Sequence, residues 1–347
     1  MSPGTVLRSE ITIDLGALRR NVERLHAAAA PAEVWAVVKA DAYGHGAVDA
    51  ARAALAGGAA ALCVATVSEG EELRRAVRDV RIVVMGPLED GEALRAREAR
   101  LEVALSAPPV PEGLDVHFKV DTGMGRWGMS LADALALPRD RLVGLMSHLA
   151  TADEPDEAFA REQILRFEEA RREFPGVPAH LANSAGALRF EEARADAVRC
   201  GIAAYGLSPF GDDPAAHGLE PVLSWRSHVA LTRSLAPGES TGYGRRFVAE
   251  EPTRIGLVPI GYADGFRRGL TGTEVLVGGT RRRVVGTISM DSFAVELGDE
   301  PVGTPVTVIG DGILAEEHAR VLGTINYEIT CGIARDPRRT VLKVVDG

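Results

Sequence analysis

The segment Val34-Trp-Ala-Val-Val-Lys-Ala40 is a short, almost continuous apolar run that ends in a lysine and an alanine. Seven more apolar runs follow in the first two thirds of the chain, and segments rich in Ala, Leu, Glu and Arg separate most of them. Uninterrupted apolar runs are typical of parallel strands whose two faces are both covered, and the intervening segments favour helix. The eight runs span residues 34–40, 61–66, 81–86, 101–106, 116–120, 142–149, 178–182 and 198–205.

This alternation over about 200 residues predicts a closed (β/α)8 barrel. An open, doubly wound sheet fits less well, because it would carry a Gly-rich phosphate turn after its first strand and none follows Val38. The Pro-rich segment after Ser106 is short, so we expect one barrel helix to be reduced to a turn. The predicted fold class is α/β, with the N-terminal barrel over residues 8–222.

The sequence changes in texture from about Leu223, where short β-branched runs alternate with Gly and Pro. Such a pattern predicts a second, mainly β domain over residues 223–347, with a hairpin turn at Gly278-Gly279. The N-terminal segment Thr5 to Asp14 looks extended and is compatible with either domain, and residues 1–7 could join the second one.

Composition excludes several classes of protein. The net charge is −10 and the basic stretches are short and scattered, so nucleic acid is not expected as a partner. Cys63, Cys200 and Cys331 are odd in number and lie far apart in the sequence, which favours reduced thiols over disulfides or a metal site. The chain shows neither a signal peptide nor an apolar stretch of about 20 residues, so we expect a cytoplasmic protein without a membrane partner.

The polar residues that interrupt the apolar pattern lie where barrel strands should end. Catalytic groups of (β/α)8 barrels lie at the carboxyl ends of the strands. A lysine there loses hydration, which lowers its pKa and suits it to Schiff-base chemistry with an aldehyde cofactor, although a lone lysine could equally reach solvent. The residues at these positions are Lys39, Lys119, Arg126, His148, His180, Ser184, Arg199 and Gly201.

The segment Lys39-Ala-Asp-Ala-Tyr-Gly-His-Gly46 resembles the cofactor-lysine signature of bacterial alanine racemases. The resemblance implies an isomerase that interconverts L-alanine and D-alanine with pyridoxal 5'-phosphate and supplies D-alanine for peptidoglycan. Further segments match that family in order and spacing: residues 119–126, 148–154, 180–184, 199–205, 243–244, 261–265 and 290–291.

Racemisation needs one group that removes the α-proton and another that returns a proton to the opposite face. The resemblance assigns these roles to Lys39, which also carries the cofactor as a Schiff base, and to Tyr243, which reaches the site from the neighbouring subunit of a homodimer. A phenol is a poor base at neutral pH, so Tyr243 needs a hydrogen-bonded cationic network beside it. The resemblance implies a supporting network of His148, Arg199 and His180.

Further cofactor contacts follow from the same resemblance. Arg199 matches the residue that faces the pyridine nitrogen of the cofactor. Decarboxylases of this fold resemble one another in carrying a carboxylate at that position. An arginine keeps its proton, so the ring nitrogen should stay unprotonated. The phosphate contacts would be the hydroxyls of Tyr43 and Ser184 and the backbone N–H groups of Gly201 and Ile202.

The resemblance also implies contacts with the substrate. Arg126 and the backbone of Met290 match groups that bind the carboxylate of the amino acid, and Lys119 matches a lysine that is carbamylated in some relatives. Tyr262 and Asp291 match residues at the entrance to the site. The segment 331–338 departs from the family pattern, because it is shorter and lacks a tyrosine found there in some relatives.

Two alternatives remain open from the sequence. A racemase of the same fold that acts on serine or on several amino acids would share this machinery, because pocket width separates such enzymes by only about 1 to 3 kcal/mol. A non-catalytic protein that binds pyridoxal phosphate would keep the barrel and its lysine but lack the β domain and its tyrosine.

Overall fold

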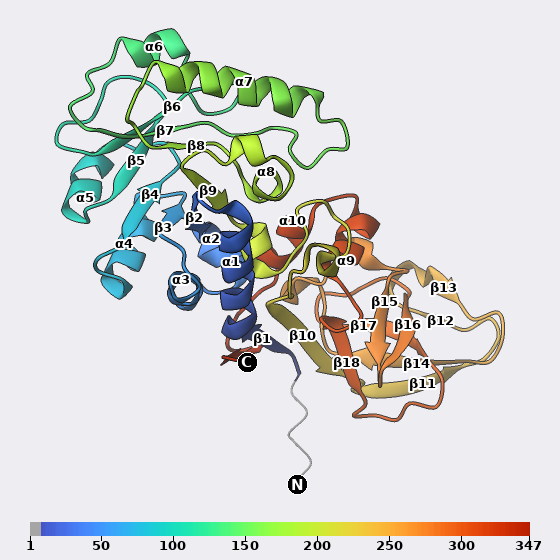
Figure 1. Ribbon diagram of the computed structural model, residues 1–347. Coiled ribbons are helices and arrows are strands. Elements are labelled where there is room, and N and C mark those ends of the chain that lie inside the picture. Colours follow the sequence, from blue (N-terminus) through green and yellow to red (C-terminus); the bar gives the residue numbers. More distant parts are fainter. Residues whose placement is uncertain (1–7) are drawn as a thin grey trace. The chain divides into compact units, whose positions relative to one another are not determined.

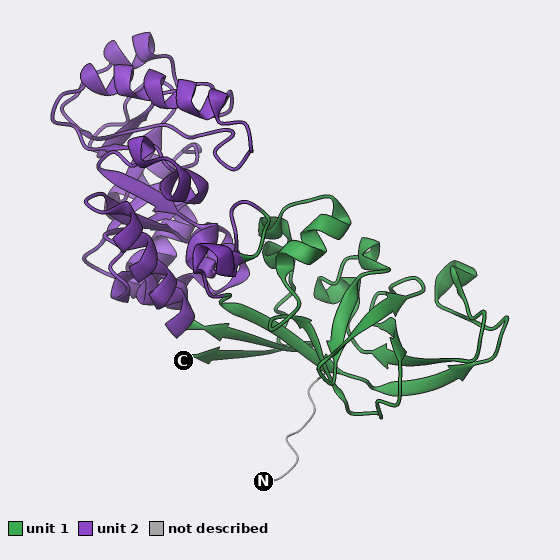
Figure 2. Ribbon diagram, turned by 45° about the vertical axis from the view of Figure 1, so that its right-hand side comes forward, with its two compact units in different colours: residues 1–15, 211–213, 221–347 green, residues 16–210, 214–220 purple. Residues whose placement is uncertain are grey.

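The computed structural model describes residues 8–347 and divides them into two compact units (Figures 1 and 2). The barrel unit comprises residues 16–210 and 214–220. The β unit comprises the described part of residues 1–15 together with residues 211–213 and 221–347. Within residues 8–347, no helix is long and apolar enough to cross a membrane.

Eight parallel strands close the barrel in the order of the sequence, from β2 to β9. The predicted (β/α)8 barrel is confirmed, because one strand lies within or across each of the eight apolar runs. Each strand ends before its apolar run does, which leaves residues such as Lys39 just beyond the strand. The strands are β2 (Glu33–Val37), β3 (Ala61–Val64), β4 (Arg81–Val84), β5 (Glu102–Leu105), β6 (Val116–Lys119), β7 (Leu142–Met146), β8 (Ala179–His180) and β9 (Ala197–Cys200).

Helices lie between most barrel strands. No helix occurs between β5 and β6, as the Pro-rich sequence there predicts. Thr66 and Glu69 form a capping box at the start of the fourth helix, which fixes where it begins. The helices are α1 (Leu15–Ala29), α2 (Lys39–Gly44), α3 (Ala47–Ala56), α4 (Val67–Ala76), α5 (Glu92–Glu98), α6 (Leu131–Leu135), α7 (Ala158–Arg172) and α8 (Ser184–Arg189), with short 3-10 turns η1 (Glu191–Ala193), η2 (Ile202–Tyr205) and η3 (Pro214–His217).

The β unit is built on a nine-stranded sheet in the order β11-β14-β17-β16-β15-β18-β10-β1-β19, beside the two-stranded sheet β12-β13. The predicted hairpin joins β15 to β16, and Gly278 and Gly279 at its turn both have positive φ. The strands are β1 (Glu10–Asp14), β10 (Leu223–His228), β11 (Leu231–Leu235), β12 (Ser240–Thr241), β13 (Phe247–Val248), β14 (Thr253–Val258), β15 (Glu274–Val277), β16 (Thr280–Val285), β17 (Phe293–Leu297), β18 (Pro305–Ile309) and β19 (Val341–Val345).

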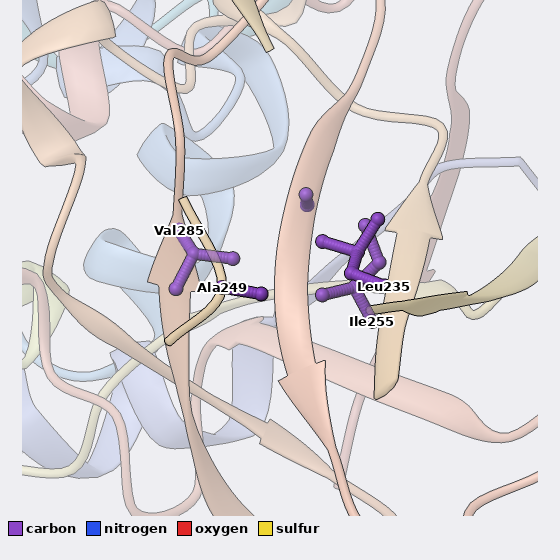
Figure 3. Close-up of a cluster of buried hydrophobic side chains, with 5 residues drawn as sticks. Leu235, Ala249, Ile255 and Val285 are labelled. Carbon is purple, nitrogen blue, oxygen red and sulfur yellow. The ribbon is translucent and has the colours of Figure 1, made fainter. Parts of the chain in front are cut away.

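Short helical segments and a small apolar cluster complete this unit. The cluster of Leu235, Ala249, Ile255, Val285 and Ala294 joins strands β11, β14, β16 and β17 (Figure 3). The helical segments are η4 (Tyr243–Arg245), η5 (Tyr262–Asp264), η6 (Arg268–Leu270), α9 (Ala315–Leu322) and α10 (Asn326–Cys331).

The N-terminal boundary of the barrel differs from the predicted one at residue 8. Strand β1 pairs with β10 and β19 in the β unit, and the barrel unit begins at Gly16. The physical reason is the alternation in β1, where Ile11 and Ile13 are buried and their neighbours are half-buried, as in a strand with a single core face. The hypothesis about residues 1–7 lies outside the described residues.

Candidate active site

Lys39 lies at the end of β2 and begins a turn of unusual handedness. Residues 40–43 all have φ near 50° and positive ψ, so the segment α2 is left-handed from its second residue. This conformation costs roughly 1–2 kcal/mol for each residue with a Cβ, so tertiary contacts must hold it. The Glu69 carboxylate accepts the N–H of Ala40 at 2.8 Å, and Asp41 accepts the N–H of Ala47 at 2.7 Å. These bonds fix the backbone on both sides of the turn.

Arg199 on β9 is the centre of a buried hydrogen-bonded network. Its Nη1 donates to Nδ1 of His180 at 2.8 Å, and its Nη2 donates to the carbonyls of Ser147 and Leu181 and, at 3.2 Å, to Nδ1 of His148. Burial lowers the pKa of Arg199 to about 10, which still leaves it charged at neutral pH. Within residues 8–347, Nε of Arg199 forms no hydrogen bond. The guanidinium is held by both ends of its fork, and one N–H remains for another acceptor.

His148 and His180 are neutral partners of this arginine. Burial, followed by the charge of Arg199, holds the pKa of each imidazole well below its ordinary value. A neutral imidazole has one donor nitrogen and one acceptor nitrogen. Since Nδ1 of both rings accepts from Arg199, each ring carries its proton on Nε2.

The network continues beyond the residues that the sequence analysis named. Nε2 of His180 lies 2.9 Å from Nδ1 of His117, and Nε2 of His117 lies 2.7 Å from Oε2 of Glu102. The other carboxylate oxygen of Glu102 accepts from Nε of Arg81 at 3.0 Å. One feature of the sequence pointed to this extension: Glu102 and His117 are polar residues near the start of otherwise apolar strand runs.

A second group of predicted residues forms a small cradle near β9. The Ser184 hydroxyl oxygen accepts the N–H groups of Gly201 at 3.0 Å and Ala203 at 3.4 Å, which leaves its own proton to donate elsewhere. A Cβ at Gly201 would lie 2.5 Å from the Tyr43 hydroxyl, so only glycine fits there. Asn183 caps helix α8 through the N–H of Gly186, and Ser184 is the first residue of the helix.

Lys119 and Arg126 add positive charge to the same end of the barrel. Lys119 ends β6 and is 6% exposed, and burial, followed by the charges of Arg199 and Arg126, lowers its pKa to about 8. Arg126 is exposed in the loop after β6, where the Asp121 carboxylate accepts backbone N–H groups from Gly123 to Gly125 and fixes the loop. Within residues 8–347, no hydrogen bond joins Arg126 to Lys119.

Four predicted residues, Tyr243, Tyr262, Met290 and Asp291, lie in the β unit and are exposed. The ring of Tyr243 is 71% exposed, whereas its carbonyl accepts from the Thr287 hydroxyl at 2.7 Å. Tyr262 and Met290 lie on adjacent loops, because the N–H of Tyr262 donates to Ser289 and the carbonyl of Met290 accepts from Ala263. The backbones of these loops are therefore fixed while their side chains face outward.

A buried charge cluster holds the Tyr262 loop. Asp264 is fully buried and accepts two hydrogen bonds from Arg8, two from Arg339 and one from the N–H of Gly261. Burial alone would raise the pKa of Asp264, but the hydrogen bonds from the two arginines hold it below its ordinary value. Arg339 also donates to Asp291 at 2.7 Å, so it joins both predicted entrance loops.

Family models match both units of this chain. The model described as the alanine racemase N-terminal domain matches residues 13–209, and the one described as the alanine racemase C-terminal domain matches residues 222–341. The chain belongs to the alanine racemase family.

Individual relatives agree with this assignment. The alanine racemase of Frankia casuarinae is 40% identical, with 97% of each chain covered. Alanine racemase 1 of Bacillus subtilis is 38% identical, covering 94% of this chain and 91% of the relative. Among solved structures, the alanine racemase of Streptomyces coelicolor is 39% identical with a TM-score of 0.89, covering 98% of both chains. That of Bartonella henselae, which has covalently bound pyridoxal phosphate, is 27% identical with a TM-score of 0.89, covering 97% of this chain and 99% of the relative.

The structure brings together most of the barrel residues that the family resemblance implied. His148, His180 and Arg199 are joined directly, and Ser184, Gly201 and Tyr43 meet in the cradle. Ile202 begins η2, next to that cradle. Tyr243, Tyr262, Met290 and Asp291 lie in the β unit. Sequence reasoning missed three residues: His117, which bonds directly to His180; Glu102, which bonds to His117; and Asp264, which fixes the Tyr262 loop.

Proposed function

We propose that this protein is an alanine racemase that interconverts L-alanine and D-alanine with pyridoxal 5'-phosphate and so supplies D-alanine for peptidoglycan. The observation that carries the proposal is Arg199, a buried cation held by its terminal nitrogens at the end of the barrel that also carries Lys39. Because the chain belongs to the alanine racemase family, we infer that this arrangement supports the reaction for which its relatives are named.

The described residues fit pyridoxal phosphate. Nε of Arg199 is an N–H without a partner within residues 8–347 and suits a ring nitrogen that accepts a hydrogen bond. Ser184 has a hydroxyl proton to donate, and the space beside Gly201 cannot hold a side chain. Lys39 would hold the aldehyde carbon, and Tyr43, Ser184, Gly201 and Ile202 would hold the phosphate.

When bound, the cofactor withdraws electrons from the α-carbon of the amino acid and makes its proton acidic. Arg199 donates a hydrogen bond without transferring its proton, because a guanidinium stays charged near neutral pH. An arginine at this position would limit electron withdrawal by the ring and so limit side reactions such as transamination. Decarboxylases of this fold resemble one another in carrying a carboxylate there.

Lys39 and Tyr243 are the proposed acid/base pair. Lys39 removes or returns the proton on one face, and Tyr243 does so on the other. His148 accepts from Arg199 at Nδ1 and carries its proton on Nε2, which forms no hydrogen bond within residues 8–347. We assign this N–H to the Tyr243 oxygen, where it would favour the phenolate. His180 steadies Arg199 from the other side.

A homodimer is part of the proposal. The Tyr243 ring is 71% exposed in its own unit, and we propose that it acts in the barrel of a second copy of this chain. Arg126 and the backbone of Met290 would bind the substrate carboxylate, Lys119 would support Arg126, and Tyr262 and Asp291 would border the entrance. Light scattering of a fully active monomer would refute the shared site.

The experiment that tests the proposal measures racemisation of alanine, serine, lysine and arginine by the purified holoenzyme. We expect alanine to be turned over fastest, and turnover of L-alanine no faster than that of lysine would overturn the assignment. The chain contains only three lysines, Lys39, Lys119 and Lys343, so borohydride reduction followed by peptide mass mapping identifies the cofactor lysine unambiguously.

We also propose a cytoplasmic location. It is supported by Cys63 and Cys200, which are buried thiols outside any disulfide in the described chain. Cell fractionation that recovers the racemase activity outside the cytoplasm would refute it.

A further inference from the structure

We propose that Glu102 and His117 are positioning residues for Arg199, because together with His180 they form a hydrogen-bonded chain that fixes which nitrogen of His180 faces the arginine. The inference rests on the proposed function only for its kinetic consequence. The arrangement itself rests on the contacts inside the barrel.

The chain crosses the barrel interior through four strands. Glu102 begins β5, His117 is the second residue of β6, His180 ends β8, and Arg199 lies on β9. The successive distances are 2.7 Å from Glu102 to His117, 2.9 Å from His117 to His180, and 2.8 Å from His180 to Arg199. Both imidazoles are fully buried, so water does not compete for their nitrogens.

One arrangement of protons satisfies every bond in the chain. Arg199 can only donate, so Nδ1 of His180 must accept and Nε2 of His180 must carry the proton. That N–H donates to Nδ1 of His117, whose Nε2–H then donates to the Glu102 carboxylate, which can only accept when ionised. The reversed arrangement would place an N–H of His180 against an N–H of Arg199.

The protonation states of the three groups agree with this arrangement. Burial holds the pKa of His117 below its ordinary value and that of His180 well below it, so both rings are neutral. Burial would raise the pKa of Glu102, but the hydrogen bond from His117 and the charge and hydrogen bond of Arg81 outweigh it and keep the carboxylate ionised. Glu102 accepts at one end of the chain and Arg199 donates at the other, so the two ends together fix the direction of its hydrogen bonds.

Two departures from a regular barrel wall make room for His117, a glycine on the facing strand and a shift in strand register. A Cβ at Gly144 on β7 would lie 1.9 Å from Nδ1 of His117, so the facing strand gives up its side chain. The β6–β7 register also shifts between Val116 and His117. The Trp35 ring packs edge-on against His117 and at a tilt against His180. These features hold the two imidazoles in bonding positions.

The consequence concerns the cation of the proposed site. Within residues 8–347, no carboxylate is hydrogen-bonded to Arg199. Glu102 is the only acid there that is connected to a histidine partner of Arg199, through His117. Loss of Glu102 or His117 would free His180 to adopt the other tautomer and present a proton to the arginine. The guanidinium would then lose the bond from Nη1 to the His180 ring and keep on that side only the bond to the His180 carbonyl.

The test uses holoenzyme with 15N-labelled histidine, in which nitrogen chemical shifts report the tautomer of each ring, assigned by single substitutions. In the unsubstituted enzyme we expect both His117 and His180 to carry their protons on Nε2. In His117→Phe we expect a mixed or reversed His180 tautomer, with kcat reduced about 10- to 100-fold, as for other residues that orient a site indirectly, and KM changed less. The exposed His26 provides the control His26→Gln, which should leave both readouts unchanged.

Glu102→Gln covers the case in which His117→Phe does not fold, because Glu102 is partly exposed at the far end of the chain. An unchanged His180 tautomer together with an unchanged kcat in either folded variant would overturn the proposal. The nitrogen shifts do not depend on which amino acid is turned over. A preparation that shows the expected tautomers but no alanine racemisation would therefore refute the proposed function and leave this inference standing.

Discussion

The barrel end that carries Lys39 and the loops that carry Tyr243 contribute to the proposed site in opposite ways. In the barrel, Arg199, His180 and His117 are buried, and each is bonded to a fixed partner. In the β unit, the Tyr243 backbone is bonded to Thr287, but its ring is 71% exposed. One region is fixed by its own hydrogen bonds, and the other exposes a side chain that we propose acts in a second copy of the chain.

The difference separates two kinds of failure. Changes in the barrel should alter cofactor binding and stability together with the chemistry, because the same buried groups serve all three. Changes at exposed rings of the β unit should alter the chemistry alone. Substitutions and pH changes in each region test this division.

Lys39→Ala should reduce alanine racemisation by about 10⁴-fold or more, because it removes both the cofactor attachment and one acid/base group. Racemisation rates and the amount of cofactor retained after gel filtration measure the two losses. The exposed Lys343 provides the control Lys343→Ala, which should keep both. A Lys39→Ala enzyme with full activity would contradict the assignment of the barrel half.

Tyr243→Phe should reduce racemisation by about 10²- to 10³-fold while cofactor content and thermal stability stay unchanged. The rate should fall in both directions, because a catalyst cannot shift the equilibrium. Exchange of the α-proton with deuterated solvent should persist for one enantiomer only, since Lys39 still serves one face. Tyr327→Phe on α10, at a half-buried tyrosine of the same unit, is the control and should keep the racemisation rate. Equal exchange of both enantiomers by Tyr243→Phe would contradict the two-base assignment.

Asp264→Asn tests whether the exposed region also depends on buried charge. Removing the carboxylate leaves Arg8 and Arg339 without their shared partner, and we expect a loss of roughly 2 to 3 kcal/mol in the free energy of unfolding, discounted because both arginines are partly exposed. Urea denaturation measures this loss. Asp311→Asn, which removes a 98% exposed carboxylate from the same unit, should be neutral. Equal stability of the two variants would refute the role of the cluster.

Acidification should destabilise the barrel between pH 6.5 and pH 4. Burial lowers the pKa of His45 from 6.5 to about 4, so below pH 6.5 the unfolded chain binds a proton that the folded chain does not. The free energy of unfolding therefore falls as the pH falls from 6.5, and the fall is complete near the folded pKa. For His45 the total loss amounts to roughly 3 kcal/mol. His117, His148 and His180 shift in the same direction.

Urea midpoints measured across this pH range check the prediction. His45→Gln should make the pH dependence shallower, whereas the exposed His26→Gln should leave it unchanged. A barrel whose stability is flat from pH 6.5 to pH 4 would contradict the assignment of neutral buried imidazoles.

The barrel strands followed from the sequence, because eight apolar runs with helical segments between them have few other solutions. The left-handed turn at residues 40–43 did not, since it depends on a carboxylate from Glu69, a residue of α4. Glu102 and His117 were missed for a similar reason. Each looks like one polar residue in an apolar strand, and only closure of the barrel brings them to His180. Their role depends on tertiary contacts that no local pattern encodes.

The position of β1 has a consequence for how the protein is made. This strand pairs in parallel with β19, from Glu10 opposite Val341 to Asp14 opposite Val345. The barrel segments are all translated before β10, so the barrel can fold while the ribosome is still adding the β unit. The pairing of β1 with β19 can form only after β19 has been synthesised. Among the strand pairs of the described chain it has the greatest sequence separation, so it is a late step of folding. A nascent chain stalled before residue 341 should therefore carry a folded barrel and a β1 strand that pairs with β10 but lacks its β19 partner.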